Sequence, residues 1–188
     1  MAGRSTLGQA MRAAGPLNFR IKEEPAVRVA VLSDSHDNIW KLEAALPHLR
    51  TAEAVIHCGD LCSPFMIRRL GEGLPGVPVH LVWGNNEGDT YLISVVAGGF
   101  PSIRLHGVLA RLDLDGVKVA VNHYPELARG LAATQDYGLV CYGHDHTAHS
   151  EWIGDCLLLN PGELMGLNGR SSLALVELPS RAVTFVDL

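Results

Sequence analysis

The sequence lacks any apolar stretch that is long enough to cross a membrane. Its longest apolar runs have six or seven residues, such as residues 26–32 with Arg28 inside the run, whereas a membrane-spanning helix needs roughly 20. The chain of 188 residues also lacks an excess of basic residues, because 15 Lys and Arg stand against 20 Asp and Glu. A general basic field for binding long nucleic acids is therefore excluded, and we expect neither nucleic acid of that kind nor a membrane as a partner.

Cysteines and charged residues are also few. The four cysteines are Cys58, Cys62, Cys141 and Cys156, and their spacing fits neither a redox CxxC pair nor a zinc ribbon. A chain of this length does not need disulfides, so we expect buried free thiols and a cytoplasmic location. With 47% hydrophobic and 19% charged residues, the chain is predicted to fold into a core rather than to be disordered.

The first 25 residues show no helical or strand period. They contain several glycines and prolines and no uninterrupted apolar segment of the kind a secretory signal needs. We expect residues 1–25 to form a disordered extension, with an organellar transit peptide as the alternative. A single domain is expected over residues 26–188.

The first half of this domain alternates between strand and helix patterns. Runs rich in β-branched residues predict strands at 26–32, 54–57 and 77–83. Asn38 can cap a helix that runs to about residue 50, and Ser63-Pro64 can open another that ends near Gly71. This βαβαβ order predicts a parallel sheet with right-handed crossovers.

The second half is richer in strands that pair with their neighbours in the chain. Asp115-Gly116 is a strong hairpin turn signal between two apolar runs. We therefore expect one α/β domain in which two sheets pack face to face with helices outside. The expected elements are a hairpin of 108–114 with 117–121, a helix at 126–134, a strand at 138–142, and strand pairs 151–153 with 156–159 and 173–178 with 182–186.

Residue types that bind metals follow five of the expected strands. Because loops at the carboxyl ends of strands converge in open α/β sheets, these side chains are expected to meet. Two carboxylates, one carboxamide and four imidazoles at five strand ends indicate a metal site. The seven candidates are Asp34, His36, Asp60, Asn85, His123, His144 and His146.

Seven ligands are more than one transition-metal ion needs when positions stay open for water and substrate. Two ions are therefore expected, with Asp60 as the shared ligand, because it stands alone on its loop and has two oxygens. Mixed nitrogen and oxygen ligands suit manganese, iron, zinc, cobalt or nickel better than calcium or magnesium. Such paired ions lie roughly 3.5–4 Å apart and stabilise in-line attack at phosphorus.

These motifs resemble the calcineurin-like metallophosphoesterase superfamily, and the segments IHCGD, GNNEGD, YGHDH and LNPGE resemble its small single-domain phosphodiesterase branch. The resemblance runs from about Val27 to the C-terminus. It implies a four-layer α/β/β/α sandwich with two face-to-face mixed β-sheets. It also implies a metal-dependent phosphodiesterase of small phosphoesters, in which a metal-bridging hydroxide attacks phosphorus in line.

Carried over residue by residue, the resemblance assigns each ligand to one of two divalent ions, with manganese expected first and iron, nickel, cobalt or zinc as alternatives. Asp60, Asn85 and His123 are expected to take part in catalysis. One ion takes Asp34, His36, His146 and the bridge Asp60, and the other takes Asp60, Asn85, His123 and His144.

The sequence departs from the family pattern at two positions. Many members have a His directly after the ligand Asn, where this chain has Asn86, and relatives often have His-Gly-His where this chain has His123-Tyr124-Pro125. Protonation of the leaving group is therefore expected to be weak, with metal-bound water or His149 as alternative donors. Asn86, Tyr124 and His149 are candidates either to support the ligands from behind or to contact substrate.

Two further side chains near the motifs have open roles. His57 either orients a ligand carboxylate or only satisfies the end of its strand. Glu163 in the NPGE segment is expected to serve a turn, with contact to a metal ligand as the alternative.

Three other functions remain as alternatives, one of them a metal-dependent nuclease of short oligonucleotides. No residue decides between a phosphodiesterase and a phosphomonoesterase or nucleotidase. A non-catalytic scaffold similar to the small retromer subunit is disfavoured, since that protein has a degraded site and all seven ligand types are present here. A homo-oligomer is left open.

Overall fold

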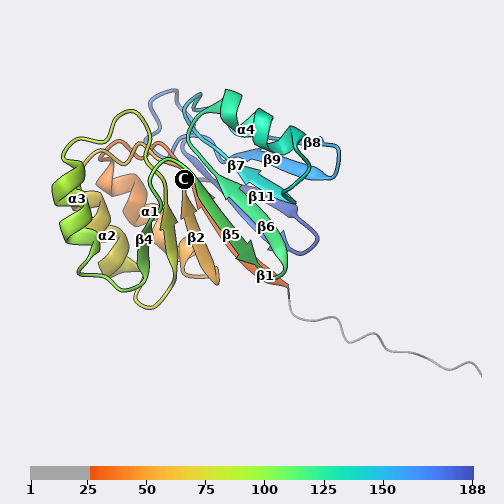
Figure 1. Ribbon diagram of the computed structural model, residues 1–188. Coiled ribbons are helices and arrows are strands. Elements are labelled where there is room, and N and C mark those ends of the chain that lie inside the picture. Colours follow the sequence, from red (N-terminus) through yellow and green to blue (C-terminus); the bar gives the residue numbers. More distant parts are fainter. Residues whose placement is uncertain (1–25) are drawn as a thin grey trace, which may run out of the picture.

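The computed structural model describes residues 26–188, which form two β-sheets and four helices (Figure 1). The extension expected at residues 1–25 lies outside the described residues. No helix within 26–188 combines the length and apolar character that a membrane span requires.

The first sheet has the strand order β11-β10-β1-β2-β3-β4. Strands β1 to β4 are parallel to one another, while β10 runs antiparallel to both β1 and β11. The sheet is therefore mixed, as expected. Its strands are β1 (Val27–Leu32), β2 (Ala54–His57), β3 (Val79–Leu81), β4 (Ile103–Leu105), β10 (Ser172–Leu178) and β11 (Ala182–Asp187).

The second sheet has the order β5-β6-β7-β9-β8 and is also mixed. Antiparallel pairs at its two edges flank the parallel strands β6, β7 and β9. Asp115 and Gly116 both have positive φ in the β5–β6 turn, which confirms the expected hairpin. The strands are β5 (Ala110–Leu114), β6 (Val117–Val121), β7 (Leu139–Cys141), β8 (His149–Ile153) and β9 (Cys156–Asn160).

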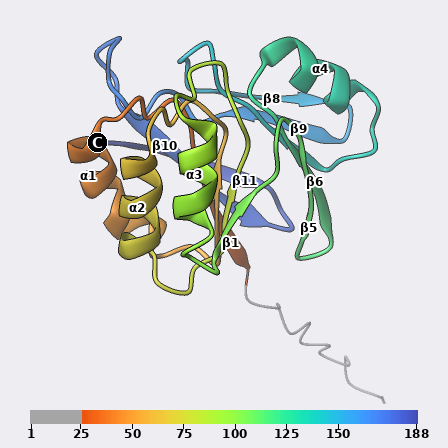
Figure 2. The same ribbon diagram turned by 60° about the vertical axis from the view of Figure 1, so that its left-hand side comes forward.

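The helices cover the outer faces of the two sheets. Figure 2 shows α1, α2 and α3 side by side against the first sheet, and α4 lies over the second. Asn38 caps α1 as predicted, because its side chain accepts a hydrogen bond from the Lys41 N–H. The helices are α1 (Ile39–Leu49), α2 (Pro64–Gly73), α3 (Thr90–Ala97) and α4 (Pro125–Ala133).

The side chains of β1 point alternately into two different cores. Ala30 and Leu32 point into the core beneath α1–α3, while Val29 and Val31 point into the core between the two sheets. A third core lies beneath α4. The expected four-layer α/β/β/α sandwich is therefore confirmed.

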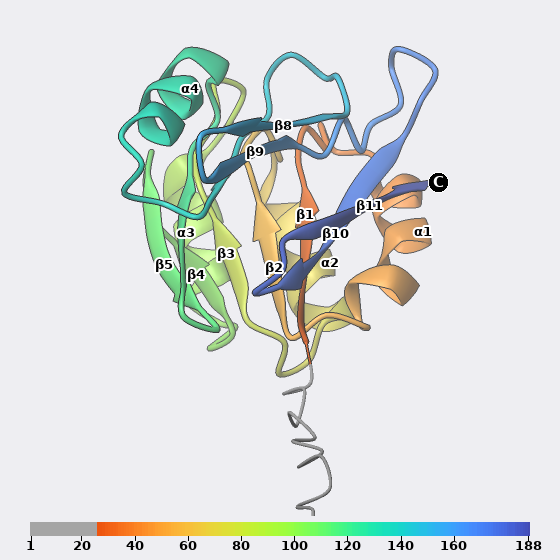
Figure 3. The ribbon, with the colours of Figure 1, turned by 90° about the vertical axis from the view of Figure 1, so that its right-hand side faces the viewer.

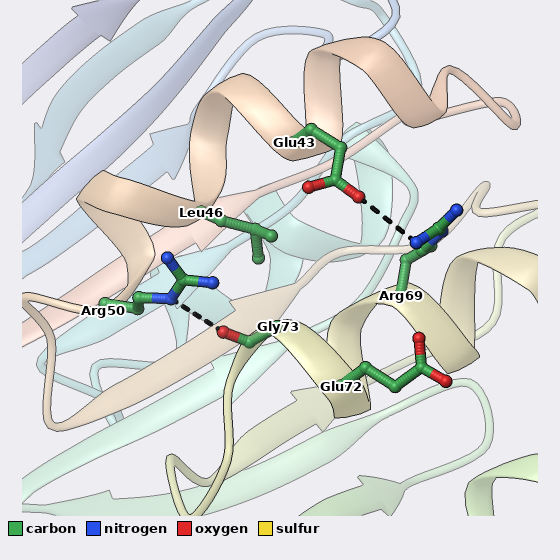
Figure 4. A pocket seen from close by; sticks show the side chains of 6 residues that line it. All are labelled: Glu43, Leu46, Arg50, Arg69, Glu72 and Gly73. Carbon is green, nitrogen blue, oxygen red and sulfur yellow. Dashed lines mark hydrogen bonds and ion pairs between the residues drawn. The ribbon is translucent and has the colours of Figure 1, made fainter.

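Polar contacts join the outer surfaces of α1 and α2. Figure 4 shows Arg69 lying 3.6 Å from the Glu43 carboxylate and the Arg50 Nε donating to the carbonyl of Gly73 over 2.9 Å. These contacts border a small surface hollow, and none of its lining residues comes from the strand-end loops. The hollow is a feature of helix packing.

The structure differs from the sequence prediction mainly at residues 77–105. Strand β3 is shorter than the predicted 77–83, and neither α3 nor β4 was predicted. The apolar sequence of α3 has no charged face to reveal a helical period, and β4 has only three residues. The four cysteines are free thiols as predicted, although Cys62 is only partly buried.

Candidate metal centre

The seven candidate ligands lie on loops at the carboxyl ends of β1, β2, β3, β6 and β7. Backbone hydrogen bonds connect these loops directly. The N–H groups of Asp34 and His36 donate to the carbonyls of Gly59 and Asp60, and the Gly143 N–H donates to the carbonyl of His123. The loops of each sheet are therefore fixed relative to one another before any ligand binds.

A first group of side chains surrounds one oxygen of Asp34. Asp34 Oδ1 lies 3.3 Å from His146 Nε2 and 3.8 Å from His36 Nε2. His36 Nε2 in turn lies 3.5 Å from Asp60 Oδ2. The three residues Asp34, His36 and His146 offer ligand atoms close enough to hold one ion.

A second group surrounds the other oxygen of Asp60. Asp60 Oδ1 lies 3.4 Å from His123 Nε2, which is 3.1 Å from Asn85 Oδ1. That amide oxygen is also 2.9 Å from His144 Nδ1. Asp60 therefore presents its two oxygens to two different groups of ligands.

The hydrogen bond at the far side of His123 determines which atom faces this second group. His123 Nδ1 lies 2.9 Å from the carbonyl oxygen of Cys58, which can only accept, so Nδ1 carries a proton. In the neutral ring, Nε2 then presents a lone pair to the oxygens of Asp60 and Asn85. Three acceptors that face one another would be satisfied by a cation between them.

Two buried atoms in the first group also have no hydrogen-bond partner in the described part of the chain. These are Asp34 Oδ1 and His36 Nε2, and each is directed at other ligand atoms. Buried polar atoms without partners are costly unless something else satisfies them. Nitrogen and oxygen donors in this arrangement fit a transition-metal ion.

The electrostatics of the centre favour ionised carboxylates. Burial opposes ionisation of Asp60, but a hydrogen bond from the protonated ring of His123 and those from Asn86 outweigh it and hold the pKa of this carboxyl well below its usual range. Burial likewise lowers the pKa of His123, but the nearby Asp60 outweighs it and raises the pKa overall. The ring of His123 therefore attracts a proton wherever no metal ion competes for its Nε2.

Backbone strain is concentrated at the ligands. Five of them adopt the left-handed conformation that non-glycine residues rarely take, which costs on the order of 1 kcal/mol each. Such strain persists only where surrounding contacts enforce it. The residues are Asp34 (φ 52), His36 (φ 38), Asp60 (φ 58), His144 (φ 76) and His146 (φ 60).

Two glycines permit the loops to approach so closely. A Cβ at Gly143 would overlap Ser33 Oγ and Asp34 Oδ2, and a Cβ at Gly84 would overlap Asp60 Oδ1. Both glycines precede ligands in the sequence, so the backbone on which a ligand is carried packs against another ligand's carboxylate.

The residues expected to contact substrate lie in different surroundings. Asn86 contacts Asp60 with two donors, its backbone N–H over 2.9 Å and its Nδ2 over 2.8 Å. The Tyr124 ring lies 5.2 Å from the ring of His123 and 5.3 Å from that of His144. His149 is instead on β8, with its Nε2 3.3 Å from Glu151.

His57 is fully buried and contacts no carboxylate through a hydrogen bond. Its Nδ1 accepts from the Gly59 N–H, so Nε2 carries the proton that Ser35 Oγ accepts over 3.0 Å. Burial lowers the pKa of His57 to about 4. Of the two roles considered for this residue, the contacts match satisfaction of the strand end.

Two acidic residues contact the candidate ligands or their loops more directly than the sequence analysis expected. Glu87 Oε1 accepts hydrogen bonds from the N–H groups of Asp60 and Gly84. Glu163 is buried, and its Oε2 lies 2.7 Å from His146 Nδ1. The role of Glu87 could have been inferred from its position two residues after Asn85. Nothing in the NPGE segment itself indicates that Glu163 is buried.

The fold and this centre define a four-layer α/β/β/α protein with metal-ligand side chains gathered at the carboxyl edges of both sheets. Residues 27–181 match the calcineurin-like phosphoesterase superfamily domain. The chain belongs to this superfamily, and the expected class of metal-dependent phosphoric ester hydrolase is confirmed at the level of the family.

Similar proteins are found in archaea and bacteria. The chain is 26% identical to phosphodiesterase MJ0936 of Methanocaldococcus jannaschii over 156 residues, covering 80% of this chain and 93% of the relative. It is 29% identical to the probable metallophosphoesterase YsnB of Bacillus subtilis over 165 residues, covering 84% and 88%.

Solved structures share the fold. An archaeal phosphodiesterase aligns with a TM-score of 0.79 at 24% identity, over 86% of this chain and all of the other. Vacuolar protein sorting 29 from Cryptosporidium parvum aligns with a TM-score of 0.58 at 14% identity, over 88% and 98%. At these identities the likeness concerns the fold alone.

Proposed function

We propose that the protein is a phosphodiesterase that uses two divalent transition-metal ions. The observation that carries the proposal is the position of Asp60, whose two oxygens face two separate groups of nitrogen and oxygen ligands. Asp34, His36 and His146 would hold one ion with Asp60. Asn85, His123 and His144 would hold the other with Asp60.

The ions supply Lewis acidity towards the phosphoryl oxygens and lower the pKa of a water molecule when they are bound. The protein's own contribution is to hold the ligands in place. Asn86 fixes both oxygens of Asp60 through its two hydrogen bonds. Manganese is the proposed native ion, with iron, nickel, cobalt or zinc as alternatives, because the donors are mixed nitrogen and oxygen atoms.

The charge around the centre favours a diester over a monoester. Neither Lys nor Arg occurs in the loops 33–38, 58–63, 84–89, 122–125, 143–148 and 161–165, whereas acidic residues are frequent there. Lys41, on α1 next to the first of these loops, donates to the C-terminal carbonyl of Leu188. The second negative charge of a monoester would therefore find no cationic side chain in these loops, which supports a singly charged diester as the substrate.

The proposed enzyme depends on its leaving group. Asn86 has no proton that dissociates near neutral pH, and both its donors already contact Asp60. General acid catalysis typically contributes about 10²–10⁴-fold. Diesters with activated aryl leaving groups are therefore expected to react much faster than alkyl diesters.

Free thiols agree with a reducing compartment, since all four cysteines are unpaired. A cytoplasmic location and a small phosphoester substrate are therefore part of the proposal.

The test combines metal content with substrate preference. The purified protein is stripped of metal, reloaded with each candidate ion, and assayed on matched diesters and monoesters with graded leaving groups. We expect two ions per chain and faster hydrolysis of diesters. Asp60→Asn should lose both ions, or one ion and nearly all activity, whereas the exposed Asp136→Asn should match the wild type.

Two outcomes would contradict the proposal. Full metal content and activity in Asp60→Asn would exclude Asp60 as the shared ligand. Faster hydrolysis of monoesters than of diesters with the same leaving group would make the protein a phosphomonoesterase.

A further inference from the structure

Glu163 is a buried acidic residue that no ligand assignment includes. It lies in the loop between β9 and β10, and its side chain is inaccessible to solvent. Its Oε2 lies 2.7 Å from His146 Nδ1 but has no hydrogen-bond partner among residues 26–188, whereas its Oε1 accepts a hydrogen bond from the Asn168 N–H. A buried carboxylate oxygen that lies this close to a ring nitrogen and forms no hydrogen bond calls for an explanation.

The loop that carries Glu163 is itself anchored to the first ligand group. The backbone N–H groups of Leu164 and Met165 donate to the carbonyls of Ser33 and Asp34. The side chain of Asn38 donates to the carbonyl of Met165 over 2.8 Å. Glu163 is thus held at a fixed position behind His146.

The chemistry of the pair determines which nitrogen of His146 faces the centre. A carboxylate only accepts, so the proton of a neutral His146 ring is placed on Nδ1, next to Glu163. Its Nε2 then presents a lone pair at 3.3 Å from Asp34 Oδ1. In the second group the same task for His123 falls to the uncharged carbonyl of Cys58.

We propose that Glu163 is a positioning residue that fixes the ring and the tautomer of His146 and adds negative charge behind the first ligand group alone. This inference rests on the proposed metal centre, but not on its substrate. Partners of this kind beyond the ligands typically change metal affinity by about 10–100-fold. The loss of Glu163 should therefore lower the affinity for one of the two ions selectively.

Glu163→Gln is the informative substitution because it keeps the size of the side chain. The carboxylate now receives the Asn168 N–H on Oε1 and lies beside His146 with Oε2. An amide has one acceptor oxygen, so one of these two neighbours would face an NH₂ group instead. Glu72→Gln, at an exposed position on α2, is the matched control.

The first measurement is equilibrium competition with a chelator for zinc, followed by counting the ions retained. We expect about a 10–100-fold loss of affinity for one ion in Glu163→Gln, little change for the other ion, and wild-type behaviour in Glu72→Gln. The proposal would be overturned if Glu163→Gln bound each of the two ions with the same affinity as the wild type does.

The second measurement distinguishes positioning from a merely structural role. In the zinc-loaded protein, the Nδ1 proton of His146 should give a slowly exchanging NMR signal that His146→Ala removes and Glu163→Gln makes exchange rapidly. An unchanged signal, or a loss of thermal stability that is the same with and without zinc, would show that Glu163 serves the fold alone. Failure to hydrolyse diesters would refute the proposed function but would not affect the conclusion drawn from these two measurements.

Discussion

At the scale of single residues, the close contact between Gly143 and the first ligand group has a measurable cost when it is disturbed. A Cβ at this position would meet Ser33 Oγ and Asp34 Oδ2. We expect Gly143→Ala to lower the free energy of unfolding by about 1–3 kcal/mol, the usual cost of overpacking. Because Asp34 must move, the variant should also bind metal more weakly.

Gly130 provides the control for this substitution. It lies within α4, and nothing is within 4 Å of the position that its Cβ would take. Gly130→Ala should therefore stabilise the protein by about 0.5–1 kcal/mol, since alanine is the better helix former. Urea denaturation of both variants measures the difference. If Gly143→Ala were as stable as Gly130→Ala, the loops would be able to accommodate the added methyl group without cost, and the expectation would be wrong.

Residue types alone were enough to propose the candidate ligands, but not the residues that support them. A carboxylate or imidazole directly after an apolar strand is visible in the sequence, as at Asp34 and His123. The role of Glu163 depends on burial and on a neighbour 17 positions away, His146, and neither is visible in the chain order. The part played by Asn86 likewise depends on the fold, which turns both its donors towards Asp60.

At the scale of elements, a pair of histidines joins β3 to the residue that follows β4. His80 Nδ1 and His106 Nε2 lie 2.9 Å apart, so one ring must donate and the other must accept. Burial, followed by the proximity of His106 and Arg104, lowers the pKa of His80 to about 4. Burial and Arg104 also lower the pKa of His106.

These lowered pKa values make stability depend on pH. The unfolded chain protonates His80 near its ordinary value of 6.5 and the folded chain only near 4, so the unfolded state binds more protons between these values. The stability that is fully present above pH 6.5 is therefore lost as the pH falls towards 4. After allowance for partial exposure of the pair, the loss should be on the order of 1 kcal/mol.

His80→Leu tests this expectation because it removes the titrating ring and keeps an apolar side chain. Urea denaturation of metal-free protein at pH 7.5 and 4.5 should show a smaller loss in His80→Leu than in the wild type. The side chain of His48 forms no hydrogen bond within residues 26–188, so His48→Gln should lose as much as the wild type. Equal losses in all three proteins would exclude His80 as a source of the pH dependence.

Elements with a clear period were predicted well and short apolar ones were not. The helix capped by Asn38 and the hairpin at Asp115-Gly116 have both local signals and periodicity. Helix α3, with the sequence TYLISVVA, has β-branched residues and no charged face, so it could not be distinguished from a buried strand. Packing against α2 and β4 decides its conformation.

At the scale of the whole molecule, the first described residues lie at the end of the first sheet that is opposite to the metal centre. Figure 3 shows β1 beginning at the lower end of the view, while the ligand-bearing loops follow the opposite ends of the strands. A protein that starts at residue 26 should therefore keep the metal content and the kcat of the full chain. A correctly folded truncated protein with a large loss of kcat would show that residues 1–25 contribute to catalysis.

Each group of ligands draws on both sheets of the sandwich. The first combines Asp34 and His36 from the first sheet with His146 from the second, and the other combines Asn85 with His123 and His144 in the same way. Bound ions would thus act as cross-links between the two halves of the core. By mass action, an ion at 100 times its Kd adds about 2.7 kcal/mol to the stability of the folded state. Chelation would remove this contribution and lower the stability of the whole fold, so the midpoint of unfolding would report the metal supply.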